Sequence, residues 1–181
     1  FLTNNSVDDG INLLKEVIGE LHDNVWSHGV TTGFSMAQKY GKNLENSTIE
    51  FAIADCGGGF LSEMKRVGLN ANTHQEAIEW CIEKGNSSKK YAAEKDDGWT
   101  QNLPSDVINN PMKKFAKHQK GNNHAGLGLA KLMELVQQYK GELRVISGDA
   151  ILSIYAGDNR MHYSSCSFWP GVIVECELKI A

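Results

Sequence analysis

Residues 47–55 carry the pattern that most constrains the fold. Apolar and polar side chains alternate along this stretch, which predicts a β-strand. Three apolar side chains share one face of the strand with Asp55, its last residue: Ile49, Phe51 and Ile53. Glycines 57–59 follow at once and mark a turn. Asp55 therefore points toward the core, where a carboxylate needs a partner because an unpaired buried charge is costly.

Helices and further strands are predicted on both sides of this strand. Apolar residues recur at helical spacing over 11–25, and a second stripe on that helix becomes polar toward its end: Leu13, Val17, Glu20, Asn24 and His28. Short helices are predicted over 33–40 and after a capping box at 73–76. A further helix begins at the glycines of 126–128. Strands are predicted over three later stretches, with a hairpin turn at 157–159: 143–147, 151–155 and 172–180.

Composition narrows the class of protein. The 181 residues are 41% hydrophobic and 22% charged, which suits a single globular domain over 1–181 and is too short for two full-sized domains. The net charge of -4 argues against non-specific electrostatic binding to nucleic acid. No apolar run approaches the roughly 20 residues that a membrane span needs. We therefore expect no nucleic-acid partner and no membrane contact. The four cysteines lack the spacing of zinc or redox motifs, so we expect reduced thiols and a cytoplasmic location.

A long polar stretch over 86–125 interrupts this regular pattern. Only 111–119 looks helical, with Pro111 at the first helical position. A stretch of this length inside a compact domain is usually a functional lid or a disordered segment. It leads into Gly126-Leu-Gly-Leu129, where a helix begins. The free N–H groups and the dipole at such a helix start favour a bound phosphate.

Besides the glycines at 126–128, two groups of residues could carry chemistry. Glu20, Asn24 and His28 share one helix face; an amide oxygen suits Mg²⁺, and a glutamate can deprotonate a water or a hydroxyl. Asp55 could accept a hydrogen bond from the exocyclic amine of a purine, and the glycines after it would let a ring approach the backbone. Taken singly, these features also fit the edge of an amphipathic helix, an ordinary turn and close helix packing. Their order along one chain favours a nucleotide site.

At this point the chain resembles the GHKL superfamily of ATPases and kinases, which includes gyrase, the large heat-shock chaperone, the histidine kinases and the mismatch-repair ATPases. Residues 20–28 are similar to its N box, 53–60 to its first glycine box and 124–130 to its second. The resemblance spans about 11–180. Within the superfamily the histidine-kinase branch is the most similar, because of the Asn-to-His spacing and of Leu127-Gly-Leu-Ala followed by Lys140-Gly-Glu-Leu.

The resemblance implies a fold and a role for each site residue. The fold is the Bergerat fold, an α/β sandwich with a mostly antiparallel mixed sheet, helices on one face, and the nucleotide between the two layers under a lid at 86–125. The implied roles are the general base for Glu20, a Mg²⁺ ligand for Asn24 and a place near the phosphates for His28. Asp55 would bind the adenine amino group. Five further residues complete the implied site, the first two in the adenine pocket and the others in the phosphate cradle: Gly57, Gly59, Gly126, Leu127 and Gly128.

Three functions are compatible with this resemblance. The first is a catalytic domain that uses ATP and Mg²⁺ for phosphoryl transfer or hydrolysis in signal transduction. The second is a nucleotide-gated interaction module, and the third an anti-sigma-like serine kinase. The expected partners are an adenine nucleotide, a protein partner or substrate, and a second copy joined through regions outside this chain. Val172 stands where the family usually has threonine, so a hydroxyl that helps to hold adenine through water is missing.

Overall fold

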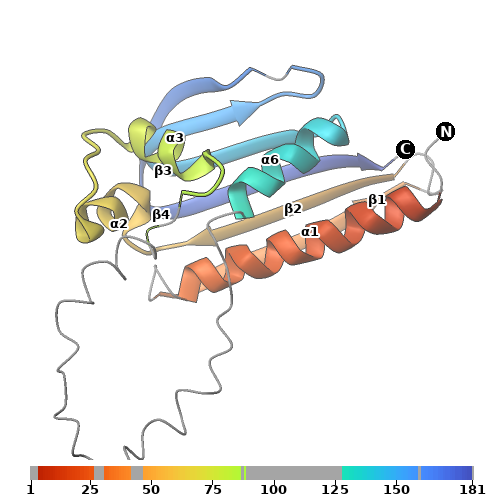
Figure 1. Cartoon of the computed structure of the whole chain (residues 1–181), viewed down its shortest axis with the longest axis horizontal. Helices are drawn as coiled ribbons and strands as arrows, with labels where there is room; N and C mark the ends of the chain where they lie inside the picture. The colour runs from red at the N-terminus through yellow and green to blue at the C-terminus, as the bar shows by residue number, and fades with distance from the viewer. Residues whose placement is uncertain are drawn as a thin grey trace, which may run out of the picture.

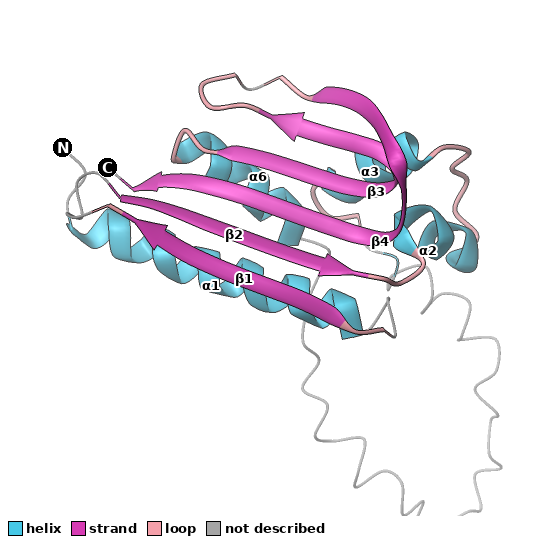
Figure 2. Ribbon diagram, turned by 180° about the vertical axis from the view of Figure 1, so that it is seen from behind, coloured by secondary structure: helices cyan, strands magenta, loops and turns pink. Residues whose placement is uncertain are grey.

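The computed structural model consists of two layers, a sheet and a set of helices on one of its faces (Figure 1). Figure 2 shows the same arrangement from the sheet side. The predicted α/β sandwich with helices on one face is confirmed. The structure describes these residues: 4–26, 31–41, 47–86, 88, 128–158 and 160–180.

The sheet has four described strands in the order β1-β2-β4-β3, and each neighbouring pair is antiparallel. Their bounds are Gly33–Tyr40 for β1, Ser47–Asp55 for β2, Glu142–Ile154 for β3 and His162–Ile180 for β4. The strand predicted over 47–55 is confirmed at both ends.

The strands predicted over 143–147 and 151–155 form one strand, β3. Its pairing with β4 shifts between Ser147 and Ala150, where Gly148 has a φ of 63°. An irregularity of this kind bends a strand without ending it, because the ladder resumes beyond the extra residue. A turn follows β3 at 155–158, where the Asp158 N–H donates to the Tyr155 carbonyl oxygen at 2.9 Å; residue 159 of the turn predicted at 157–159 lies outside the described residues.

The short helix predicted over 33–40 is wrong, because these residues form β1. This strand pairs with β2 along its whole length, from Gly33 opposite Asp55 to Tyr40 opposite Thr48. Met36, Ala37 and Gln38 are good helix formers, but helix propensities differ by less than about 1 kcal/mol per residue, and pairing with an adjacent strand overrides so small a preference.

Four helices are described: α1 (Asn4–Asn24), α2 (Gly59–Val67), α3 (His74–Ile82) and α6 (Gly128–Gln138). The capping box predicts the start of α3 correctly, since Thr73 Oγ1 accepts the Glu76 N–H at 3.1 Å. None of the described helices is both long and apolar enough to cross a membrane. The core lies between the two layers, and its most buried side chains come from α1, α3, α6 and the sheet: Val17, Ile78, Leu132, Leu135, Val145 and Val174.

The predicted lid lies outside the described residues, apart from Asn86 and Ser88. The same holds for the helix predicted over 111–119.

Candidate functional site

The described parts of the three predicted boxes lie near one end of the sheet. The C-terminal ends of α1 and β2 and the N-terminal end of α6 lie near one another in both views (Figures 1 and 2). A Cβ atom added to Gly33 would lie 2.8 Å from Val25 Cγ1, so the end of α1 packs against the start of β1. Gly33 pairs with Asp55. The residue after Asn24 therefore contacts the strand neighbour of Asp55.

Glu20 lies against the first turn of α6. A Cβ atom added to Gly128 would be 3.1 Å from Glu20 Oε2, so the absence of a side chain at Gly128 lets the carboxylate approach the backbone. Lys131 Nζ is 3.5 Å from Glu20 Oε1 and 3.7 Å from Glu16 Oε2. The side chains of Glu20 and Lys131 are 13% and 27% exposed. This places a partly buried, ion-paired carboxylate at the start of a helix.

Asp55 is buried at the end of β2 and is held by three neighbours. Its Oδ1 atom accepts the Gly57 N–H at 2.7 Å, which fixes the turn into the glycines. Its carbonyl oxygen accepts the Trp169 indole N–H at 2.8 Å. Gly171 lies so close that a Cβ atom there would collide with the Asp55 carbonyl oxygen and carboxylate. The carboxylate is thus oriented by its surroundings.

The glycine turn leads directly into α2, which the sequence analysis did not predict. Gly59 has a φ of 70°, and a Cβ atom on it would lie 2.8 Å from Ser147 Oγ. The fully buried Ser147 hydroxyl accepts the Phe60 N–H at 3.1 Å and so holds the first turn of α2 against β3. Ser147 pairs with Val172 of β4.

Sequence reasoning missed Lys131, Ser147 and Trp169. The sequence could have indicated Ser147, because it follows Leu143 and Val145 in the core-facing alternation of its strand. A hydroxyl at such a buried position needs a hydrogen-bond partner. No sequence feature indicated Lys131 or Trp169, since only the fold brings them to Glu20 and Asp55.

Other predicted site residues are less enclosed or not described. Asn24 is exposed at the end of α1. His28, Gly126 and Leu127 lie outside the described residues. No cluster of three or more His, Cys, Asp or Glu side chains in the described part of the chain could hold a metal ion. Mg²⁺ at Asn24 would therefore take its remaining ligands from nucleotide phosphates and water, as is usual for this ion.

The cysteines offer no activated thiolate in the core. Burial raises the pKa of the Cys81 and Cys176 thiols to about 12. Cys56, between Asp55 and Gly57, is exposed, and none of the four cysteines forms a disulfide.

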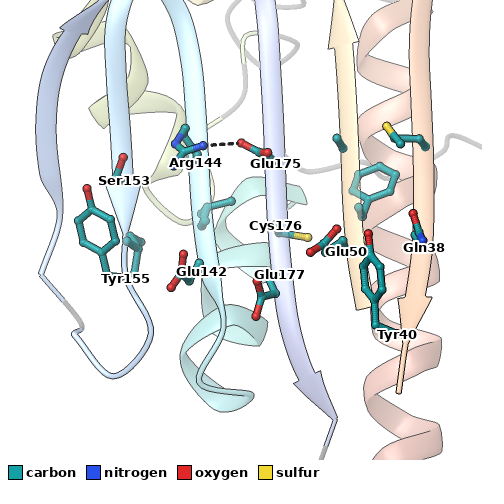
Figure 3. Close-up of a pocket in the computed structure, with 15 residues that line it drawn as sticks. Gln38, Tyr40, Glu50, Glu142, Arg144, Ser153, Tyr155, Glu175, Cys176 and Glu177 are labelled. Carbon is teal, nitrogen blue, oxygen red and sulfur yellow. Dashed lines mark hydrogen bonds and ion pairs between the residues drawn. The ribbon is translucent and has the colours of Figure 1, made fainter. Parts of the chain in front are cut away.

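No protein-family model matches the chain, and neither does any curated protein or solved structure. A functional assignment therefore rests on the fold and on the geometry of the site. A hollow of about 210 Å³ lies on the other face of the sheet, away from Glu20 and Asp55 (Figure 3). It is a separate feature from the site at the helix ends.

Proposed function

We propose that this chain binds ATP with Mg²⁺ between its helices and its sheet, and uses it for phosphoryl transfer or hydrolysis as a histidine-kinase-like domain of the GHKL type. One observation carries the proposal: the Glu20 carboxylate lies so close to Gly128, at the start of α6, that a Cβ atom there would be 3.1 Å from Glu20 Oε2. A helix start favours phosphate, so the proposed base stands beside the proposed phosphate cradle. Two residues more than 100 positions apart in the sequence thus lie close together in the fold, which supports the proposal.

The adenine end of the proposed site is supported by Asp55. Its Oδ1 atom accepts the Gly57 N–H, which leaves Oδ2 to accept the exocyclic amine of adenine. GTP carries a carbonyl oxygen at the corresponding position, which would face the carboxylate with no proton between them. Because an unsatisfied buried polar group costs about 1–3 kcal/mol, we expect a clear preference for ATP.

The phosphate end depends on position and charge more than on covalent chemistry. Glu20 would accept the proton of an attacking water or hydroxyl, a role that typically contributes about 10²–10⁴-fold to the rate. Asn24 would hold Mg²⁺ together with phosphate oxygens, and the ion would neutralise charge that develops on them. The N–H groups at the start of α6 would face the phosphates.

Calorimetry with ATP and with GTP, each with Mg²⁺, tests this proposal. ATP should bind at millimolar concentration or below, GTP markedly more weakly, and Asp55→Asn should remove the preference while the circular dichroism spectrum is unchanged. The asparagine can present a donor to the amine, which mispairs the contact. Absence of ATP binding, or equal binding of the two nucleotides to the wild type, would refute the proposal.

A second function, a nucleotide-gated interaction module without turnover, is favoured by the ion pair between Lys131 and Glu20. The Lys131 ammonium group competes with a water or a substrate hydroxyl for the Glu20 carboxylate. Lys131→Met should raise ATP turnover if the pair restrains Glu20, and Glu20→Gln should reduce it with little effect on ATP affinity. If the wild type and Lys131→Met both bind ATP and neither turns it over, the module is the better description. Phosphate found on a serine of a co-purified protein would favour the serine kinase instead.

A further inference from the structure

The sheet face opposite the helices, which we call the open face, is not covered by any described helix (Figure 2). Exposed apolar side chains stand on it along β1, where Phe34 is 73% and Met36 is 67% exposed. The alternate residue Ser35 points the other way, toward α1, where its hydroxyl lies 2.8 Å from His22 Nε2. Apolar side chains gathered on an uncovered sheet face indicate a contact surface.

The strand register places three glutamates side by side across the open face. Glu50 of β2 is directly opposite Glu177 of β4, and Glu177 is directly opposite Glu142 of β3. We call these three residues the glutamate row; Figure 3 shows them together. Like charges at directly opposite positions destabilise a sheet. No described lysine, arginine or histidine lies within ion-pair distance of the row.

The neighbouring positions show that this sheet can pair its charges. Two residues along β4 from Glu177, Glu175 is opposite Arg144 of β3, and their side chains form an ion pair at 2.8 Å. The glutamate row has no such counterion in the described part of the chain. Its negative charge is therefore available to a ligand.

A hollow of about 210 Å³ lies over the row and has an acidic lining, with four carboxylates against one guanidinium. Tyr40 and Tyr155 flank the row on its two sides (Figure 3), and they are 44% and 48% exposed. Exposed aromatic rings beside carboxylates suit a cationic side chain, which gains both charge and cation–π contacts.

We propose that the open face docks a partner protein through a segment that carries lysine or arginine side chains on one edge and apolar side chains on the other. The cations lie over the glutamate row between Tyr40 and Tyr155. The apolar side chains pack on Phe34 and Met36. This surface is on the opposite face of the sheet from Glu20 and Asp55, so the docking proposal does not depend on the nucleotide proposal.

The negative charge of the open face argues against other binding partners, namely a second copy of the chain, a nucleic acid or an anionic membrane. A second copy placed face to face would bring a second glutamate row against the first, and this repulsion opposes a symmetric dimer. Nucleic acids and anionic membranes carry the same sign of charge as the row and are repelled. A basic protein segment is complementary in both its charge and its apolar content.

The test uses three synthetic helical peptides and the ¹⁵N-labelled full chain. The first peptide has a lysine edge and a leucine edge, the second has glutamine for each lysine, and the third has serine for each leucine. Amide shifts are followed by NMR at low and high salt. The first peptide should move signals of the open face, bind at least tenfold more tightly than the other two, and lose at least tenfold in affinity in E50Q/E142Q/E177Q.

A matched variant controls for net charge. E79Q/E83Q/E134Q removes three negative charges from α3, from the residue that follows it and from α6, and should change the affinity less than twofold. If the row variant folds poorly, Glu177→Gln alone should still weaken binding several-fold. Equal binding of the lysine–serine peptide would reveal general charge attraction and overturn the proposal. So would shifts confined to the helical face, or a dimer in sedimentation that uses the open face and excludes the peptide.

Discussion

Replacing Glu177 by glutamine should stabilise the protein, and replacing its neighbour Glu175 should not. Glu177 has a glutamate directly opposite on each side, Glu50 and Glu142. Directly opposite Cβ atoms in a sheet are about 5 Å apart, and each unfavourable pair costs about 0.2–1 kcal/mol. Coulomb's law in water gives a similar figure, about 0.8 kcal/mol for two unit charges at about 5 Å. Two pairs, reduced by salt screening, give an expected gain of about 1 kcal/mol.

The control sits two residues away on the same strand. Glu175→Gln removes the partner of Arg144, and an exposed ion pair contributes about 0–1 kcal/mol, so this change should be neutral or destabilising. For a chain of this size a gain of about 1 kcal/mol raises the melting temperature by roughly 2–4 °C. Urea unfolding at neutral pH measures both variants, and 1 M NaCl should shrink the difference because the Debye length falls to about 3 Å. The reasoning fails if Glu177→Gln is no more stable than Glu175→Gln at low salt.

Two further predictions concern the site at the helix ends. Ser147→Ala should lower the free energy of unfolding by about 1–3 kcal/mol, because the Phe60 N–H loses its acceptor. Ser153→Ala, at a buried serine with no such bond, should lower it less in the same unfolding assay. Iodoacetamide should modify the exposed Cys56 at pH 8 far faster than the buried Cys176, as mass spectrometry of peptides can show, because only a thiolate reacts and burial raises the pKa of Cys176 to about 12. ATP with Mg²⁺ should slow the reaction at Cys56 several-fold, and an unchanged rate would count against adenine binding beside Asp55.

Local patterns predicted the elements with strong periodicity. The strict alternation of 47–55 predicted β2, and the glycines at 126–128 predicted the start of α6, because both signals are complete within a few residues. β1 was mistaken for a helix, because an edge strand exposed along its whole length lacks the buried alternation that marks a strand. α2 was missed although Leu61, Met64 and Val67 recur at helical spacing, and only the bond from its first turn to Ser147 leaves no local signal.

The residues of the candidate site come from short motifs, whereas their contacts could not be predicted from the sequence. The boxes named Glu20, Asp55 and Gly128 from short motifs, but the approach of Glu20 to Gly128 depends on how α1 packs against α6. The same is true of Lys131, which stands one turn along α6 and reaches Glu20 only in the folded chain. Ion pairs between distant elements leave no periodic signal in a sequence.

The glutamate row was also invisible in the sequence, and the register of the core explains why it is there. Phe51 is opposite Cys176 on the helical side of β2 and β4, and a slip of one residue would move their neighbours Glu50 and Glu177 into the core. The core therefore fixes the register, and the register forces the glutamates together. Glutamine or lysine at any of these positions on the open face would relieve the repulsion without touching the core. Since the row opposes folding, its charge is expected to be useful only when a cation covers it.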